Sequence, residues 1–301
     1  MNPCASFRAI EAAELSPLPS VESSLMTRLL TALVAVPLAL AAVFLFPDRW
    51  LFFFVALCIA WAAGEFVSLV RHWAPDAPLR LIPILVVVVG WFAYRHLVLG
   101  GFPTADGDFG LPGLMLVMGL GVSVLILFAR TPFEQSLPAV GAFAFAVPYF
   151  ALPIVAVVRL RQIDPWVVFL LFAIVWLGDS AAYYVGSTFG RHKMAPRVSP
   201  NKSWEGAIAG LVIALAATLA WSMWRFGRVE WGLMALGGIT GVSGQIGDLV
   251  ESMLKRGAGV KDSGGLLPGH GGALDRLDAL LFAAPTLLAG LMWLGPDLVG
   301  R

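Results

Sequence analysis

Residues 252–278 read SMLKRGAGVKDSGGLLPGHGGALDRLD, a polar and glycine-rich segment that lies between two apolar runs. The two runs, 231–254 and 274–296, are each long enough to cross a bilayer, which takes about 20 mostly apolar residues. Glycines and prolines fill the middle of the segment, so we expect residues 257–272 to form a loop. The stretch predicts two membrane helices joined by a polar loop.

The composition of the whole chain is that of an integral membrane protein. Of its 301 residues, 59% are hydrophobic and only 13% are charged, whereas about a quarter of a soluble chain is charged. The mean hydropathy is +0.84. A formal net charge of +1 gives no indication of a nucleic-acid partner and no basic run supports one, so we expect none.

We expect an all-α, polytopic integral membrane protein with about nine transmembrane helices. We divide the chain into a poorly ordered N-terminal tail (1–26), an N-terminal set of helices (27–160) and a C-terminal set (161–301) that contains the polar segment. Pro148 and Pro153 are expected to kink the fifth span. The predicted spans are 28–46, 50–70, 80–99, 111–129, 137–159, 165–187, 204–225, 231–254 and 274–296.

The first span also has features of a signal peptide, because Arg28 precedes an apolar core that ends in small residues. The apolar stretch after Arg28 is long enough to cross a bilayer, and further spans follow directly, so we favour an uncleaved first helix. The even-numbered loops carry ten Lys and Arg residues and the odd-numbered loops six, which predicts that the even-numbered loops are cytoplasmic. We therefore expect a protein of the bacterial inner (cytoplasmic) membrane, with segments 188–203 and 252–278 both facing the cytoplasm.

Acidic residues flank these two segments inside the predicted spans. A carboxylate at mid-membrane costs at least about 2.5 kcal/mol, so it is expected to face a wet cavity, a partner or a metal. Asp179 and Asp248 lie near the ends of their spans, while Asp275 and Asp278 lie one turn apart at the start of the last one. We expect Asp248 and Asp275 to meet and to bind Mg²⁺, with room for a second metal ion, because two hard oxygen ligands with no cysteine and a single nearby His suit this ion.

The same segments supply cations and glycine amides that suit phosphates. Lys202, Lys255, Arg256 and Lys261 are within or beside them, and we expect the glycine amides and the start of the last helix to form an anion site. Carboxylates that hold a metal beside cations that hold phosphates are typical of phosphoryl or nucleotidyl transfer. The membrane setting suggests that one of the phosphates belongs to a lipid.

Each residue also has a simpler interpretation. Lys255 and Arg256 fit positively charged anchors at a helix end, Asp275 fits a helix cap, and a lone His270 is more often structural than catalytic. Asp179 and Glu65 could pair with other residues of the bundle. The concentration of so many of these residues in two segments favours a site.

The motifs resemble those of the phosphatidate cytidylyltransferase (CDP-diacylglycerol synthase) family. The match runs through Ser252-x-x-Lys255-Arg256, Lys261-Asp262-Ser263-Gly264 and Pro268-x-His270-Gly271-Gly272-x-x-Asp275-Arg276-x-Asp278. Upstream, Asp179-Ser180, Ser199-Pro200-Asn201-Lys202-Ser203-Trp204-Glu205-Gly206 and Gly244-Gln245-x-Gly247-Asp248 extend it. The resemblance is dense over the C-terminal half and only general over spans one to five.

This resemblance implies that CTP and phosphatidate react to give CDP-diacylglycerol and pyrophosphate with Mg²⁺, at a membrane-lipid surface, and that homodimers occur in the family. On this basis we assign metal binding to Asp248 and Asp275. The catalytic residues we assign are Asp248, Asp275, Lys261, Asp262, His270 and Asp278. Substrate binding is assigned to Ser199, Asn201, Lys202, Lys255, Arg256, Arg276 and Asp179.

Two other classes fit parts of the pattern. A CDP-alcohol phosphotransferase also uses membrane aspartates and a metal, but its aspartates follow one another along consecutive helical turns, whereas here a glycine loop divides them. A transporter for an anionic substrate also places charges at membrane depth, but transporters usually show two related halves and none is visible here. Neither alternative releases pyrophosphate from CTP.

Overall fold

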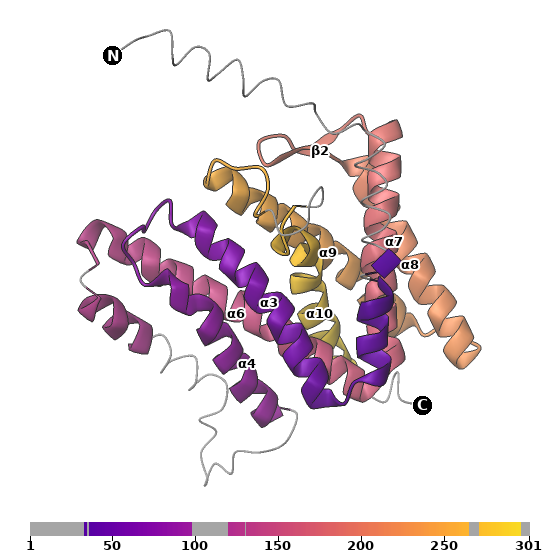
Figure 1. Ribbon diagram of the computed structural model, residues 1–301. Helices are drawn as coiled ribbons and strands as arrows, with labels where there is room; N and C mark the ends of the chain where they lie inside the picture. Colours follow the sequence, from indigo (N-terminus) through magenta and orange to yellow (C-terminus); the bar gives the residue numbers. More distant parts are fainter. Residues whose placement is uncertain (1–32, 35, 98–119, 130, 265–270, 296–301) are drawn as a thin grey trace.

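The computed structural model describes residues 33–34, 36–97, 120–129, 131–264 and 271–295 (Figure 1). Within these ranges seven helices are long and apolar enough to cross a membrane. They are α3 (Asp48–Val70), η1 with α4 (Leu79–Leu81 and Ile82–Leu97), α6 (Phe133–Ile163), α7 (Pro165–Phe189), α8 (Trp204–Phe226), α9 (Trp231–Gly257) and α10 (Leu274–Leu294).

These helices confirm the all-α membrane fold and correspond to seven of the nine predicted spans. The other two windows, 28–46 and 111–129, extend beyond the described residues, and their described parts are helical over Val36–Leu45 and 120–128. The count of nine therefore stays a prediction. The predicted N-terminal tail also lies outside the described residues, and the predicted division near residue 160 falls within the last turn of α6.

Local sequence explains several helix ends. Asp164 ends α6 in an extended conformation and begins α7, where its side chain accepts a hydrogen bond from Trp166 N at 2.9 Å and Pro165 occupies the first turn. Ser203 caps α8 in the same way through Gly206 N, at 3.2 Å. α6 continues as one helix of 31 residues through Pro138, Pro148 and Pro153.

The connection between α7 and α8 is a β-hairpin, where a basic loop was expected. Strands β1 (Lys193–Ala195) and β2 (Ser199–Ser203) pair antiparallel. Pro200 lacks an N–H, and a two-stranded sheet tolerates it because both of its strands are edges. The segment has no alternation of apolar and polar residues, which is why the sequence did not predict strands.

The bundle has two halves, and α10 joins them. α3, α4 and α6 share one apolar core, which includes Phe52, Phe66 and Phe150. α7 packs along α8, and α9 packs along α10, around a second core. α10 contributes Leu274 and Leu281 to the first core and Leu287 and Leu291 to the second, so the helix packs against both halves (Figure 1).

Ion pairs fasten the helices at the opposite end of the bundle from the hairpin. Arg161 of α6 binds Asp48 of α3 at 2.5 Å, and Arg225 of α8 binds Asp164 at 2.6 Å. Both pairs join helices that are neighbours in space, and Arg161 also donates to the carbonyl oxygens of Val43 and Phe46. These contacts connect α3 to α6, and α8 to the junction between α6 and α7.

Candidate active site

The β-hairpin and the C-terminal end of α9 lie against each other, so the two polar segments meet at one end of the bundle. Lys202 Nζ of β2 is 2.7 Å from Asp248 Oδ2 of α9. Arg256 Nε donates to the carbonyl oxygen of Val198 at 3.3 Å. The predicted juxtaposition of segments 188–203 and 252–278 is therefore present, and Ser199 and Asn201 lie on the same strand as Lys202.

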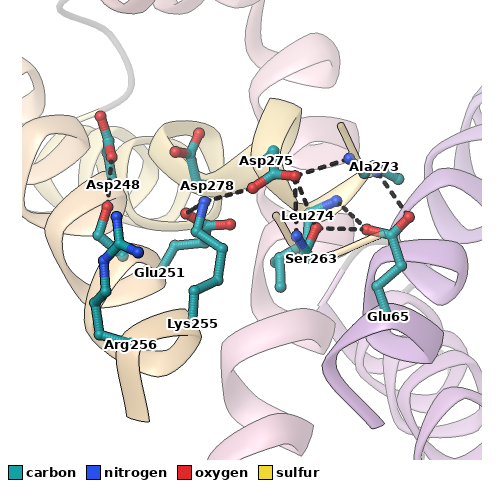
Figure 2. A network of polar contacts seen from close by, with 12 residues as sticks. Glu65, Asp248, Glu251, Lys255, Arg256, Ser263, Ala273, Leu274, Asp275 and Asp278 are labelled. Atoms are coloured by element: carbon teal, nitrogen blue, oxygen red, sulfur yellow. Dashed lines mark hydrogen bonds and ion pairs between the residues drawn. The ribbon is translucent and has the colours of Figure 1, made fainter. Parts of the chain in front are cut away.

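Three carboxylates converge beside the hairpin. One oxygen from each of Asp248, Glu251 and Asp278 lies within 4.8 Å of the other two. α9 presents Asp248 and Glu251 from one face, since they are three residues apart, and α10 presents Asp278 (Figure 2). The backbones of the two helices touch here, because a Cβ at Gly247 would lie 2.5 Å from the carbonyl oxygen of Asp278.

This acidic group, Asp248, Glu251 and Asp278, fits a divalent cation. Glu251 is 1% exposed, and its Oε1 has no hydrogen-bond donor within the described part of the chain. A buried carboxylate oxygen without a donor is rare, and a bound ion is one explanation for it. Three hard oxygen ligands without a thiolate or imidazole among them suit Mg²⁺.

Lys255 connects the acidic group to Asp275. Its Nζ is 2.7 Å from Glu251 Oε2 and 2.5 Å from Asp275 Oδ1. All three side chains are largely buried, with exposed fractions of 14% for Lys255, 1% for Glu251 and 13% for Asp275. The other oxygen of Asp275 accepts from Gly272 N at 2.7 Å, from Ser263 N at 3.2 Å and from Ser263 Oγ at 3.0 Å. Asp275 thus binds Lys255 and the loop.

The expected meeting of Asp248 with Asp275 is not the arrangement found. Asp278, one turn further along α10, takes that place together with Glu251, while both oxygens of Asp275 are already hydrogen-bonded (Figure 2). Lys255 likewise contacts carboxylates in this structure, where a phosphate contact was expected. Asp275 therefore contacts Lys255 and the loop in this structure, and the metal role of Asp248 and Asp275 stays a prediction.

The start of α10 differs from expectation in a second way. Its first amides are bonded to carboxylates, since Ala273 N and Leu274 N donate to Glu65 of α3 at 3.0 and 2.9 Å, and Gly272 N donates to Asp275. These donors are therefore occupied and do not form the predicted anion site. Gly271, with φ +73°, provides the left-handed turn that brings the chain into this position.

The sequence matches the cytidylyltransferase family over residues 26–293, which is most of the chain. The protein belongs to the cytidylyltransferase family. Its relatives include proteins named phosphatidate cytidylyltransferase from several bacteria. The Haemophilus influenzae protein is 35% identical over 290 residues, covering 87% of this chain and 96% of the relative. The Pseudomonas aeruginosa protein is 32% identical over 291 residues (89% and 97%), and the Brucella suis protein is 40% identical over 191 residues (62% and 69%).

Of the remaining predicted residues of this cytidylyltransferase-family site, the described ones lie on α7, on the loop after α9 and on α10. Lys261 and Asp262 are exposed and form no ion pair with a described residue. Asp179 of α7 lines a small cavity together with Gln245 of α9. Arg276 is exposed on the first turn of α10, and His270 lies outside the described residues.

Sequence analysis did not select Glu251 and gave Glu65 only a packing role. Glu251 carries a usable signal, because it lies three residues after Asp248 and four before Lys255, on one face of a membrane helix. Glu65 carries only the general signal of an acid within a span. Its partners are 198 to 209 residues away in the sequence, so no local pattern could identify them.

Proposed function

We propose that this protein is a phosphatidate cytidylyltransferase, which transfers CMP from CTP to phosphatidate and releases pyrophosphate. The observation that carries the proposal is the acidic group beside Lys202 at one end of an apolar bundle. A metal site at the membrane boundary suits a reaction between a water-soluble triphosphate and a lipid phosphate. The names of the relatives from three bacterial genera support the same activity.

The chemistry requires no activated side-chain nucleophile. A phosphate monoester has its second pKa at about 6, so the phosphatidate oxygen is already anionic at neutral pH. That oxygen forms a bond to the α-phosphorus of CTP, and the bond between the α-phosphorus and the bridging oxygen breaks, so that pyrophosphate leaves with the electron pair. The barrier arises from bringing two polyanions together and from the charge that develops on pyrophosphate.

Asp248, Glu251 and Asp278 would hold the cation in this proposal. When bound, Mg²⁺ neutralises phosphate charge and stabilises the departing pyrophosphate. Lys202 is placed to contact a phosphate at this position, because its ammonium group already lies 2.7 Å from Asp248 on the open hairpin side. Lys255 balances Glu251 and Asp275 and thereby fixes the position of the carboxylates.

We also propose that the site faces the cytoplasm of a bacterial inner membrane. The Lys/Arg bias of the loops supports this orientation, and CTP is a cytoplasmic nucleotide. The homodimer that the family resemblance implies stays a prediction. The mass of the protein–detergent particle, measured by light scattering after size-exclusion chromatography, tests it.

The proposed activity is tested with the detergent-purified protein, phosphatidate micelles, Mg²⁺ and CTP. With label on the α-phosphate, the label should appear in an organic-phase lipid; with label on the γ-phosphate, it should appear in pyrophosphate. Asp76→Asn serves as a control because Asp76 is exposed and pairs only with Gln135 in the described structure. If labelled lipid forms without pyrophosphate, or if no lipid is labelled, the proposal fails.

A further inference from the structure

Glu65 is a buried acid of α3 that contacts the loop between α9 and α10. Its side chain is 8% exposed. Oε1 accepts from Ala273 N at 3.0 Å, while Oε2 accepts from Leu274 N at 2.9 Å and from Ser263 Oγ at 2.9 Å. Figure 2 shows the carboxylate directed from α3 towards these donors. No ion pair joins Glu65 to a Lys or Arg among the described residues.

These contacts give Glu65 the role of a helix cap supplied from a distant part of the chain. The first amides of a helix have no partner within the helix, and the residue before α10, Ala273, provides no side-chain cap. A carboxylate at this position satisfies two of those amides and is also favoured by the helix dipole. α3 therefore fixes where α10 begins, and α10 carries Asp275 and Asp278.

Glycines on both flanks of the loop fit around the Glu65 carboxylate. A Cβ at Gly264 would lie 2.7 Å from Glu65 Oε1. A Cβ at Gly272 would overlap both Glu65 Oε2 and the Ser263 hydroxyl. The Glu65 carboxylate, which comes from the other half of the protein, therefore leaves no space for a side chain at either Gly264 or Gly272.

A chain of polar contacts runs from Glu65 to the acidic group. The Ser263 hydroxyl lies 2.9 Å from Glu65 Oε2 and 3.0 Å from Asp275 Oδ2, and its single hydrogen serves one of them at a time. Asp275 binds Lys255, which binds Glu251. A displacement of Glu65 would therefore move the groups that hold Lys255 in place.

We infer that Glu65 is a positioning residue for cytidylyl transfer. It sets the two loop flanks and the start of α10, and so keeps Asp275 and Asp278 of α10 in register with Lys255 and Glu251 of α9. This inference rests on the proposed function for its kinetic part only. It also gives the N-terminal half of the bundle a part in building the site.

The test compares Glu65→Gln with Glu65→Asp and with Asp76→Asn, an exposed acid-to-amide control. Glutamine keeps the size of Glu65, but whichever way its amide is oriented, the NH₂ group faces Ala273 N or Leu274 N, which are donors themselves. Aspartate keeps the acceptors but is one methylene shorter. If the acceptors matter, activity should fall in the order wild type, Glu65→Asp, Glu65→Gln; if only packing matters, Glu65→Gln should resemble the wild type.

Two measurements on monodisperse protein decide the result. The kcat/KM of Glu65→Gln for CTP should fall about tenfold or more, with a raised KM that a simple loss of folded protein would not produce. Hydrogen exchange at Ala273 and Leu274 should become faster in Glu65→Gln, while exchange in α4 stays unchanged. Asp76→Asn should match the wild type in both.

Each outcome bears on the inference separately from the proposed function. Wild-type kcat and KM in Glu65→Gln would overturn the positioning role. Unchanged exchange at Ala273 and Leu274 would overturn the capping contact itself. A wild-type protein that makes no lipid product from CTP would instead contradict the proposed function, and the exchange experiment would still test the contact of Glu65 with α10.

Discussion

Lys255 lies buried between two carboxylates, and Lys255→Met should destabilise the protein more than any exposed charge removal. Methionine keeps most of the aliphatic stem, so the change removes mainly the charge. The side chains of Glu251 and Asp275 are 1% and 13% exposed, so both would remain buried without their shared cation. Breaking a buried ion pair by removing one partner typically costs about 3–5 kcal/mol, which is the loss of unfolding free energy we expect.

The matched control is Arg228→Met. Arg228 pairs with Glu230 at 2.6 Å, a distance close to those of Lys255, but the Arg228 side chain is 72% exposed. An exposed pair contributes about 0–1 kcal/mol, because water solvates both partners once they separate. Because the ion-pair distances are similar, a difference in unfolding free energy between the two variants reports the effect of burial.

The assay is equilibrium unfolding of the detergent-purified proteins followed by tryptophan fluorescence, with EDTA present so that no divalent cation replaces the missing ammonium group. Lys255→Met should unfold at a clearly lower denaturant concentration than the wild type, and Arg228→Met should unfold close to it. Equal shifts for the two variants, or an unshifted Lys255→Met, would refute the buried three-residue network.

Three further predictions concern the same site. Glu251→Gln should abolish the rise in thermal unfolding temperature that Mg²⁺ gives the wild type, and a retained rise would remove Glu251 from the ligands. Lys202→Ala should raise the KM for CTP with the fold intact, whereas wild-type kinetics would exclude a substrate contact. Gly272→Ala should cost about 1–3 kcal/mol through overlap with Glu65, measured by unfolding. Gly64→Ala, with open space at its Cβ position, is the control and should be neutral or slightly stabilising.

Hydropathy predicted the helices of the C-terminal half closely, because a span must supply about 20 apolar residues and satisfy its backbone internally. Predicted spans 165–187 and 204–225 correspond to α7 and α8 within two residues at either end. α6 extends four residues beyond its predicted span at each end, because polar residues continue the helix past the apolar core. Hydropathy carries no information on such extensions.

The sequence predicted where the site lies, but not which carboxylates of α9 and α10 come together there. Asp248 and Lys202 come together as expected from the shared side of their segments. The choice between Asp275 and Asp278 depends on how α10 is rotated against α9, which the close contact at Gly247 determines. The hydrogen bonds of Glu65 depend on the docking of α3 against a loop about 200 residues later, and only a three-dimensional structure reveals them.

The most direct test of the central claim is the Mg²⁺ dependence of CDP-diacylglycerol formation in the wild type and in Asp278→Asn, with folding of both checked by size-exclusion chromatography. Chelation should stop the wild-type reaction and added Mg²⁺ should restore it, while folded Asp278→Asn should stay inactive at every Mg²⁺ concentration. A wild type that remains active after complete chelation, or an Asp278→Asn variant with normal turnover, would contradict a cation held by Asp248, Glu251 and Asp278.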